Sequence, residues 1–293
     1  MERLVRIEDV RRYVRGVRAA GKTVAFVPTM GALHAGHRSC VAVAKTSADA
    51  VVVSIFVNPT QFGPAEDLSK YPRPLSRDLE LCAEWGVDAV FVPDAKEMYP
   101  AEQDVWVEVD RLSRGLCGRT RTGHFRGVAT VVLKLFNIVA PDIAVFGQKD
   151  AQQAVVIREM AGQLDVPVRI LLSPTVRESD GLAMSSRNAY LSAEERERAP
   201  WIHRALLRAK EIVSRGERDA SVVALEIRRG MEASGISGIE YVEIVGARDL
   251  AALERLEGRV LIAVAARVGK TRLIDNIVIA VTPDGGVEET LLF

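Results

Sequence analysis

Short runs of apolar and β-branched residues, separated by segments with helical periodicity, constrain the fold of this chain more than any other feature. Three such runs cover residues 24–27, 50–57 and 143–146. The second reads AVVVSIFV, and a nearly continuous apolar run of this kind is typical of a strand buried on both faces, as in parallel sheets. Strands that alternate with helices indicate a doubly wound α/β sheet. We therefore expect a Rossmann-like domain built around these strands.

The alternation changes near residue 178, and this change predicts a second, smaller α+β domain. Ser192 and Glu195 have the spacing of a capping box, so a long helix is expected from there to about Ser214. Apolar periodicity predicts a further helix over residues 222–231 and strands over residues 239–245, 260–268 and 277–281. The predicted domains are residues 1–177, Rossmann-like, and residues 178–293, the C-terminal α+β domain.

The remaining elements are expected from the same patterns. Ile7, Val10, Val14 and Val17 lie at helical spacing, which predicts an amphipathic helix. Further helices are predicted over residues 75–82 and 128–139, and further strands over residues 89–92, 105–109 and 168–172. The stretch over residues 111–126 is basic and rich in glycine. It is interpreted either as a mobile anion-binding loop or as a solvated surface loop.

A literal match to the Walker A pattern GxxxxGK[ST] covers residues 16–23 but is not interpreted as a phosphate loop. A true phosphate loop follows a buried strand and leads into a helix. Here the predicted order is reversed, because the helix comes first and the strand over residues 23–27 follows. Gly21 is expected to end the helix as its C-cap.

Charge and cysteine content narrow the classes of function. The chain has 293 residues, with 39 Lys and Arg against 39 Asp and Glu. Zero net charge argues against nucleic-acid binding by broad phosphate neutralisation. Cys40, Cys82 and Cys117 lack the spacing of a zinc site, so free thiols in a reducing compartment are expected. Without an apolar signal core or a bilayer-spanning run, we expect a cytoplasmic protein with no membrane or nucleic-acid partner.

The stretch over residues 24–40, which reads VAFVPTMGALHAGHRSC, joins the first apolar run to two histidines. Pro28 is expected to end the pairing of the strand, because proline has no N–H group to donate. His34 and His37 then stand at the start of a helix, where unpaired N–H groups and the dipole favour a phosphate. Imidazoles three residues apart lie on one helix face, and Gly36 lets a nucleotide approach the backbone. Taken alone, the pair is equally open to interpretation as surface caps or as half of a metal site.

Two other predicted strands end in polar residues. Gln61 follows residues 50–57 and can both donate and accept hydrogen bonds, which suits a hydroxy acid. A plain turn residue is the simpler alternative. Lys149 follows residues 143–146, where its ammonium group suits a phosphate. Asp150 is a candidate for a ribose hydroxyl or Mg²⁺, or for the N-cap of the next helix.

These strand ends are expected to lie at one edge of the sheet. Right-handed crossovers place the carboxyl ends of parallel strands on the same side, and α/β sheets bind ligands there. Pro28, Asn58 and Gly147 mark the three ends. Residues 181–188 add a small, polar, flexible stretch with one cation, typical in composition of a phosphate-wrapping loop. We therefore expect a single site.

Five segments complete the signal: PTMGALHAGH (28–37), SIFVNPTQFGPAEDLSKYPR (54–73), GHFRGV (123–128), FGQKDAQQ (146–153) and DGLAMSSRNAYLS (180–192). In this order the chain resembles the pantothenate synthetase family, the AMP-forming pantoate–β-alanine ligases. The resemblance covers most of residues 22–200, and LIDN (273–276) extends it. The HxGH and MSSR segments alone indicate only the nucleotidyltransferase superfamily, in which they correspond to the HIGH and KMSKS signatures.

The resemblance implies a two-step reaction. The pantoate carboxylate attacks the α-phosphorus of Mg·ATP to give pantoyl adenylate and pyrophosphate, and the β-alanine amine then displaces AMP. The implied ATP-binding residues are Met30, Gly31, Ala32, Leu33, His34, Ala35, Gly36, His37, Gly147, Gln148, Lys149, Asp150, Val176, Met184, Ser185, Ser186 and Arg187. The implied Mg²⁺ has no assigned protein ligand.

The resemblance also implies which residues act on the other substrates. Gln61 and Gln153 hold pantoate, and Gln61 also contacts β-alanine. The implied catalytic residues are His34, His37 as proton donor, Lys149 and Arg187. The family is homodimeric, so a homodimer is implied. The second domain is expected to close as a lid that shields the labile adenylate from water.

Two positions depart from the usual family form, because Thr60 stands where Met is common and Gln148 where Glu is common. Two alternative functions are weighed against the ligase. Another adenylyltransferase of the superfamily would have no reason to keep both Gln61 and Gln153. A non-catalytic nucleotide-binding protein is disfavoured because the candidate catalytic residues, His37 among them, are all present.

Overall fold

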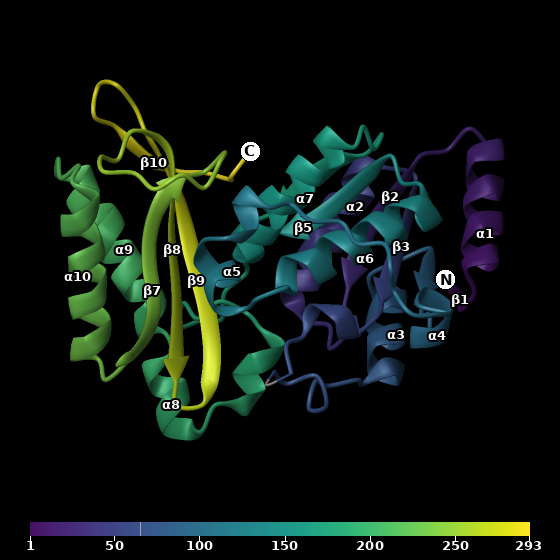
Figure 1. Cartoon of the computed structure of the whole chain (residues 1–293), viewed down its shortest axis with the longest axis horizontal. Coiled ribbons are helices and arrows are strands. Elements are labelled where there is room, and N and C mark those ends of the chain that lie inside the picture. The colour runs from purple at the N-terminus through teal and green to yellow at the C-terminus, as the bar shows by residue number, and fades with distance from the viewer. Residues whose placement is uncertain (65) are drawn as a thin grey trace. The chain divides into compact units, whose positions relative to one another are not determined.

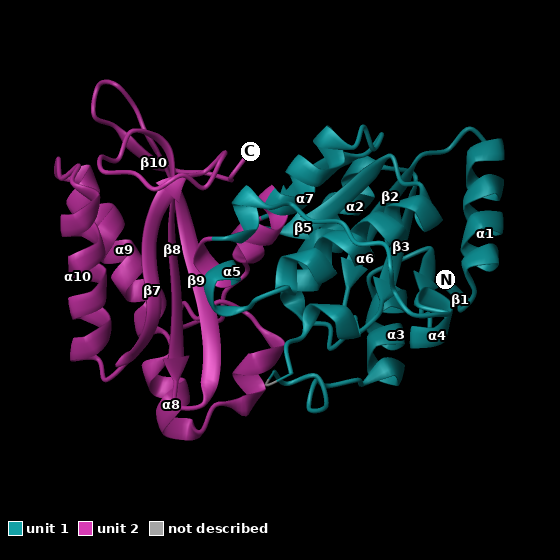
Figure 2. Cartoon of the chain, in the orientation of Figure 1, with its two compact units in different colours: residues 1–114, 118–147, 156–173 teal, residues 115–117, 148–155, 174–293 magenta. Residues whose placement is uncertain are grey.

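The computed structural model describes residues 1–64 and 66–293 (Figure 1). The chain divides into two compact units, which are coloured separately in Figure 2. Unit 1 comprises residues 1–114, 118–147 and 156–173, and unit 2 comprises residues 115–117, 148–155 and 174–293. The units therefore interleave along the chain, because the short segments 115–117 and 148–155 belong with the C-terminal residues.

Within the described residues, unit 1 is organised around a six-stranded parallel sheet in the order β1-β4-β3-β2-β5-β6. The strands are β1 (Glu2–Leu4), β2 (Val24–Thr29), β3 (Ala50–Ile55), β4 (Ala89–Phe91), β5 (Ile143–Gly147) and β6 (Arg169–Ser173). The helices are α1 (Ile7–Ala19), α2 (Ala35–Ser47), η1 (Pro59–Gln61), α3 (Leu75–Glu84), α4 (Ala95–Met98), η2 (Arg111–Ser113) and α6 (His124–Val139). Two more helices, α5 (Leu116–Thr120) and α7 (Ala151–Gln163), have residues in both units. The predicted doubly wound α/β fold is confirmed.

The strand order places a topological switch point between β2 and β5. From β2 the chain proceeds to β3 and β4 on one side, whereas β5 and β6 lie on the other. Open α/β sheets bind ligands outside the carboxyl ends of the strands at such a point. β3 is buried at every position, as expected for a β-branched strand inside a parallel sheet. The sheet therefore holds the ends of β2, β3 and β5 at one edge.

The expectation that Pro28 ends strand pairing is wrong on one side of β2. The ladder to β3 continues to Thr29, with Pro28 opposite Ser54. The ladder to β5 covers only Ala25 and Phe26. The missing N–H group of proline is tolerated because β2 has no partner on the β5 side at that position.

Unit 2 contains, within the described residues, a four-stranded antiparallel sheet in the order β10-β9-β8-β7. Its strands are β7 (Gly238–Gly246), β8 (Gly258–Val268), β9 (Thr271–Val281) and β10 (Val287–Glu289). Its helices are η3 (Gln148–Asp150), η4 (Ser186–Tyr190), α8 (Ala193–Arg198), α9 (Trp201–Ser214) and α10 (Ala220–Ala233). Leu206 of α9 and Ile227 of α10 share an apolar core with Ile262 of β8 and Ile277 of β9. The predicted α+β character is confirmed, and β9 begins six residues before the predicted start at 277, at Thr271.

The helix predicted from Ser192 to Ser214 is two helices. Ser192 and Glu195 form the predicted capping box, in which the side chain of each bonds the backbone N–H of the other. That helix, α8, ends at Arg198 and α9 begins at Trp201. Pro200 lies between them, and proline in a helix interior removes a hydrogen bond and clashes with the preceding turn.

Two further expectations, for segments between residues 105 and 126, are wrong. Residues 105–109 form no strand, because no neighbouring strand pairs with them and the N–H of Val107 instead donates to Oγ1 of Thr130. Residues 111–126 are not a solvated loop, since they contain η2, α5 and the first turn of α6. Leu116 and Phe125 are buried there, so apolar side chains anchor a segment whose basic composition suggested solvent.

The ends of α1 agree with the rejection of a phosphate loop. α1 includes Gly16 and ends at Ala19, and Gly21 follows with a left-handed φ of 71°. β2 then begins at Val24, so the helix precedes the strand. Cys40, Cys82 and Cys117 form no disulfide with one another, as expected, and all three are buried. Among the described residues, none of the helices has the length and apolar character needed to cross a bilayer.

Gly127 in α6 gives a test of the packing between α6 and η1. A Cβ at this position would overlap the carbonyl group of Thr60 and lie 2.8 Å from the Cα of Gln61. We expect Gly127→Ala to lower the free energy of unfolding by about 1–3 kcal/mol, because a methyl group forced against backbone displaces one of the two segments. Denaturant unfolding followed by circular dichroism measures the change.

Gly16→Ala is the matched control, since Gly16 is also a helix glycine but has no atom within 4 Å of the position that a Cβ would take. It is expected to raise the free energy of unfolding by up to about 1 kcal/mol through helix propensity. Equal effects of the two substitutions would contradict the close packing of α6 on η1.

Candidate active site

The turn after β2 is held by a carboxylate from α3. Asp78 is 1% exposed, and its carboxylate accepts the N–H groups of Ala32 at 2.9 Å and Leu33 at 2.8 Å. Gly31 and Ala32 have left-handed φ angles of 80° and 51°. A Cβ at Gly31 would lie 2.9 Å from Oδ2 of Asp78, so glycine is required there. Burial raises the pKa of Asp78, although the two N–H groups act in the opposite direction.

His34 and His37 cap the N-terminus of α2 reciprocally. Nδ1 of His34 accepts the N–H of Gly36 at 3.1 Å, and Nδ1 of His37 accepts the N–H of His34 at 3.2 Å. Because each Nδ1 accepts a hydrogen bond, the proton of each neutral imidazole lies on Nε2. A Cβ at Gly36 would lie 2.9 Å from Cε1 of His34. The interpretation as helix caps is therefore correct, and in this arrangement the hydrogen of each ring is on Nε2.

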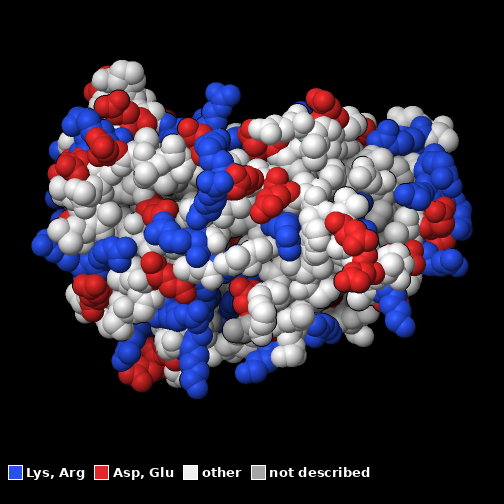
Figure 3. All heavy atoms as spheres, viewed as in Figure 1, with Lys and Arg blue, Asp and Glu red and all other residues white. Residues whose placement is uncertain are grey.

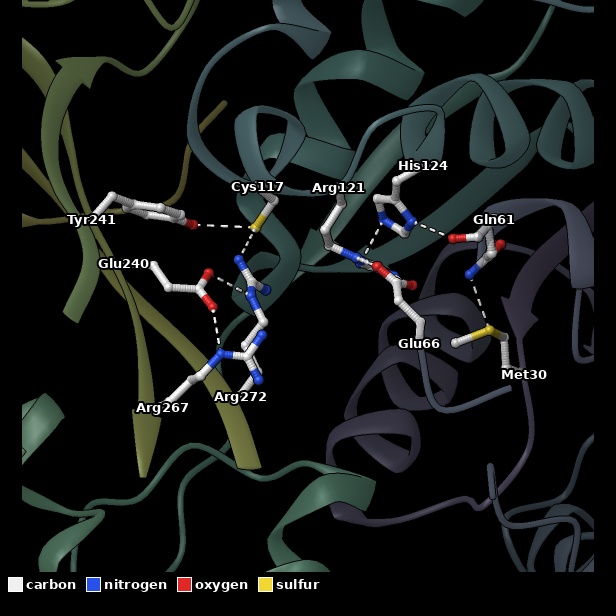
Figure 4. Close-up of polar contacts among 10 residues, drawn as sticks. All are labelled: Met30, Gln61, Glu66, Cys117, Arg121, His124, Glu240, Tyr241, Arg267 and Arg272. Atoms are coloured by element: carbon white, nitrogen blue, oxygen red, sulfur yellow. Dashed lines mark hydrogen bonds and ion pairs between the residues drawn. The ribbon is translucent and has the colours of Figure 1, made fainter. Parts of the chain in front are cut away.

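Gln61 lies in η1, and two neighbours, of which Figure 4 draws Met30, orient its side-chain amide. Nδ2 of Asn58 donates to Oε1 of Gln61 at 3.1 Å, and Nε2 of Gln61 donates to Sδ of Met30 at 3.0 Å. Asn58 is buried, and its Oδ1 accepts from the hydroxyl groups of Thr60 and Tyr99. A plain turn residue would be exposed and unconstrained, whereas Gln61 is buried and its amide orientation is fixed.

The GHFRGV segment holds the main chain at Gln61 (Figure 4). Nδ1 of His124 lies 2.8 Å from the carbonyl oxygen of Gln61, and Nε2 lies 2.9 Å from Nη1 of Arg121. A carbonyl only accepts and a guanidinium only donates, so Nδ1 carries the proton and His124 is neutral. Arg121 also forms a two-bond ion pair with Glu66, with both N···O distances at 2.7 Å. The basic segment therefore forms part of the support of η1.

In unit 2, residues 148–150 form η3, which is tied to β9 and to the C-terminal segment. Nδ2 of Asn276 donates to the carbonyl oxygens of Gln148 and Lys149 at 3.1 and 2.9 Å. Oε1 of Gln148 accepts the N–H of Leu292 at 3.0 Å. Nζ of Lys149 lies 4.0 Å from Oδ2 of Asp150, whose side chain is 50% exposed. Lys149 therefore extends from a backbone fixed on both sides.

The second segment of unit 2 is a short hairpin followed by η4. The N–H of Met184 donates to the carbonyl oxygen of Val176 at 3.0 Å, which closes the hairpin. Oγ of Ser185 accepts the N–H of Arg187 at 3.2 Å and caps η4. The small, polar stretch over residues 181–188 is therefore held by a backbone bond to Val176 and by the side-chain cap of Ser185.

The expected site residues are divided between the two units. Unit 1 holds Met30, Gly31, Ala32, Leu33, His34, Ala35, Gly36, His37, Gln61 and Gly147. Unit 2 holds Gln148, Lys149, Asp150, Gln153, Val176, Met184, Ser185, Ser186 and Arg187. Unit 1 brings Met30 against Gln61 and His34 against His37. In unit 2, Gln153 is half-buried on α7.

Several residues that support the site were missed from the sequence. Asp78 had a usable signal, because it falls with Leu75, Leu79 and Cys82 on the same face of an amphipathic helix, where an aspartate is out of place. His124 and Asn276 lie in the GHFRGV and LIDN segments, which contribute to the family resemblance but contain no residue with an implied role. Their hydrogen bonds to carbonyl oxygens far along the chain cannot be read from spacing.

The described part of the chain offers no cluster suited to a metal ion, and charges of both signs are mixed on the face shown in Figure 3. Among residues 1–64 and 66–293, no group of three or more His, Cys, Asp or Glu is arranged to hold a metal ion. The histidine pair of α2 is therefore not part of such a group. On the face shown in Figure 3, positive and negative side chains are interspersed, in keeping with the zero net charge.

Comparison with protein families gives one match that spans nearly the whole chain. Residues 2–278 match the model of the pantoate-beta-alanine ligase family. The chain is 53% identical over 281 residues to the pantothenate synthetase of Moorella thermoacetica, covering 96% of this chain and 99% of that relative. It is 51% identical over 273 residues to that of Pelotomaculum thermopropionicum, covering 93% and 97%.

Solved structures agree with the sequence comparison. The crystal structure of pantothenate synthetase from Thermus thermophilus superposes with a TM-score of 0.88 at 42% identity, covering 94% of this chain and 98% of the other. The pantoate-beta-alanine ligase of Francisella tularensis, solved in complex with beta-gamma ATP and beta-alanine, superposes with a TM-score of 0.78 at 34% identity, covering 94% and 97%.

The Glu66–Arg121 ion pair predicts a pH dependence of stability. Burial opposes ionisation of Glu66, but the hydrogen bonds and charge of Arg121 outweigh it and hold the pKa of Glu66 below its usual value. A lowered folded-state pKa contributes stability that is present above the unfolded-state pKa and is lost as pH falls through the folded-state pKa. We expect Glu66→Gln to destabilise the protein by about 1–3 kcal/mol at pH 7. The difference from the unsubstituted protein should shrink below about pH 4.5.

Glu80→Gln is the control, because the Arg77–Glu80 pair has the same charges but both side chains are more than half exposed. Exposed pairs contribute little, so no comparable pH-dependent difference is expected. Urea unfolding from pH 3 to pH 8 measures both variants. A Glu66→Gln effect that stays constant down to pH 3 would show that the ion pair is not its source.

Proposed function

The chain belongs to the pantoate-beta-alanine ligase family, and we propose how its residues divide the ATP-dependent joining of pantoate to β-alanine. In the first step, an oxygen of the pantoate carboxylate attacks the α-phosphorus of ATP, the bond to the β-phosphate breaks, and pantoyl adenylate and pyrophosphate form. In the second step, the β-alanine nitrogen attacks the acyl carbon, the bond to AMP breaks, and pantothenate forms as the nitrogen loses a proton.

The paired histidines of α2 are the observation that carries the proposal. They follow β2 directly, at the switch point of the sheet, and their Nδ1 atoms are engaged by backbone N–H groups. Each Nε2–H group is therefore a donor next to the positive end of the α2 dipole. Negative charge grows on the phosphate oxygens in the transition state, so preorganised donors lower its energy. We assign His37 as the proton donor to the departing pyrophosphate and His34 as a phosphate ligand.

The other proposed ATP contacts fall into two sets. Residues 30–37 lie along the nucleotide from the turn after β2, with Gly147 at the end of β5. Residues 148–150, Val176 and residues 184–187 complete the set. Lys149 supplies positive charge to the phosphates through a compact ammonium group, and Arg187 through a planar guanidinium with several N–H donors. The hydrogen bonds that fix η3 and η4 support these roles, because a donor that is already ordered needs no reorganisation during the reaction.

Gln61 and Gln153 are the proposed pantoate ligands, and Gln61 is also the proposed contact for β-alanine. The support for Gln61 is its buried and oriented amide beside Met30. A primary amide both donates and accepts, which suits the hydroxyl and carboxylate groups of pantoate. A site built to hydrogen-bond a hydroxyl group rejects analogues that lack it, because its own polar groups are then left unpaired.

Positioning accounts for most of the proposed rate enhancement. A carboxylate is already ionised at neutral pH, so the first step needs no general base. Holding two reactants in line is worth many orders of magnitude when their freedom is removed on binding. The hydrogen bonds of Asp78 and His124 to the site backbone, and of Asn58 to the side chain of Gln61, support this view.

The proposed Mg²⁺ enters with ATP. Mg²⁺ keeps several waters and usually binds through phosphates and one or two carboxylates. The half-exposed carboxylate of Asp150 fits that requirement. When bound, the ion neutralises charge on the phosphates.

We propose a cytoplasmic location and a homodimeric assembly, with pantoate, β-alanine and ATP as small-molecule partners. Three buried cysteine thiols that form no disulfide with one another support a reducing compartment. The homodimer rests on the resemblance to the family.

Pyrophosphate release from ATP is the direct test of the first step. With purified protein and Mg²⁺, release is expected to require pantoate and to proceed without β-alanine, because the adenylate forms before the amine reacts. A coupled pyrophosphate assay measures it. Release that is independent of pantoate, or no release from protein that binds ATP, would contradict the proposed reaction.

Lys149→Ala and Lys22→Ala form a matched pair of variants for this assay. Lys149→Ala is expected to reduce pantoate-dependent release about tenfold or more, since a charge-assisted phosphate contact is lost. Lys22 is exposed and lies in the rejected Walker match, so Lys22→Ala should stay within about twofold. Loss of release in Lys22→Ala would revive the Walker interpretation.

A further inference from the structure

Two adjacent polar residues in β9, Asp275 and Asn276, have no role in the reaction described above. Each is 4% exposed, in a strand that is otherwise largely apolar. A buried polar side chain destabilises a fold unless it is hydrogen-bonded. Their hydrogen bonds therefore show what they hold in place.

Asn276 holds the backbone from which Lys149 extends. Its Nδ2 donates to the carbonyl oxygens of both Gln148 and Lys149, at 3.1 and 2.9 Å. These two bonds fix the orientation of the amide. Its Oδ1 is buried and, among the described residues, has no hydrogen-bond partner. Burying an oxygen without a hydrogen bond costs free energy, so it is the donor group that explains an asparagine at this position.

Asp275 holds the base of the hairpin that leads to η4. Its carboxylate forms a two-bond ion pair with Arg177, with N···O distances of 2.7 and 3.0 Å. Nη1 of Arg177 also donates to the carbonyl oxygen of Gly181 at 3.2 Å. Arg177 forms an isolated β-bridge with Ala183. The guanidinium thus joins β9 to both arms of the hairpin.

The geometry of β9 allows Asp275 to hold the hairpin while Asn276 holds the backbone of η3. Consecutive residues of a strand point to opposite faces of the sheet, and Asp275 shares its face with Leu273 and Ile277 of the unit 2 core. β9 pairs with β8 along its whole length, with Val264 opposite Asp275 and Ala263 opposite Asn276. A strand held in this way is a rigid support, and adjacent residues on it have a fixed separation.

We propose that Asp275 and Asn276 are positioning residues that set the spacing between Lys149 and the residues 184–187. The inference rests on the proposed function, in which both segments contact ATP, and it deepens that function by giving the nucleotide contacts of unit 2 a common support. If the pair served stability alone, apolar residues of similar size would serve as well or better.

Asn276→Asp tests this with the least change in shape, because a carboxylate cannot donate to the two carbonyl oxygens and repels them. We expect the dissociation constant of ATP, measured by calorimetry without pantoate, to rise about tenfold or more. The KM for pantoate should stay within about twofold, since Gln61 belongs to unit 1 and Gln153 lies in α7, outside the η3 backbone that Asn276 holds. Asn137→Asp, on the exposed side of α6, is the matched control and should change neither.

A double-mutant cycle separates positioning from a general loss of structure. If Asn276 acts through Lys149, Asn276→Asp added to Lys149→Ala should weaken ATP binding by no more than about twofold beyond Lys149→Ala alone. The same reasoning pairs Asp275→Asn with Arg187→Ala. Multiplicative effects in both cycles, or equal changes in ATP and pantoate constants, would overturn the proposal.

Two further measurements distinguish a variant that fails to fold, and a protein that does not catalyse the proposed reaction, from a failure of the positioning role. Thermal unfolding identifies a variant that fails to fold, and Asn276→Ala, which removes the donor without adding charge, then takes its place in the cycle. Pantoate-dependent pyrophosphate release by the unsubstituted protein is measured in parallel. If that release is absent, the proposed function has failed; if it is present and Asn276→Asp and Asn276→Ala bind ATP normally, the positioning inference alone has failed.

Discussion

The carboxylate of Asp78 determines the geometry on which the N-terminal half of the site depends. It is buried, and it accepts two consecutive N–H groups in the turn after β2. Those bonds hold Gly31 and Ala32 in left-handed conformations that a free chain would rarely adopt. The same turn leads into the start of α2. Asp78 therefore helps to position the histidine cap, and the cap sets the tautomer of both rings.

The same principle recurs at the other candidate residues. Asn58 orients the amide of Gln61 and His124 holds its carbonyl group, while Asn276 holds the backbone of Lys149. In each case the residue proposed to touch substrate is positioned by a buried neighbour. A reaction that relies on alignment and preorganised donors needs this rigidity, because small displacements of the reacting groups cost large factors in rate.

The sequence predicted the architecture well where a local pattern determines local structure. The β-branched runs became β2, β3 and β5, and the capping box at Ser192 formed as expected. Prediction failed where contacts with other segments of the chain determine the structure. Residues 105–109 alternate like a strand but have no strand beside them, and the basic segment that contains Leu116 is anchored by burial of apolar side chains.

The candidate site shows the same limit. Motif spacing identified His34, His37, Gln61 and Lys149, because these residues are adjacent to strand ends. It gave no role to His124 or Asn276, whose partners lie 63 and 127 residues away in the chain. Nor could it show that residues 148–155 belong to unit 2, since that assignment depends on packing against strands that come more than a hundred residues later.

Transfer of oxygen from pantoate to AMP tests the central claim most directly. Pantoate labelled with ¹⁸O in both carboxylate oxygens is incubated with the protein, ATP, Mg²⁺ and β-alanine, and the products are analysed by mass spectrometry. Attack of the carboxylate on the α-phosphorus leaves one labelled oxygen in AMP and one in pantothenate. Unlabelled AMP, or label in inorganic phosphate together with ADP, would contradict an acyl-adenylate route.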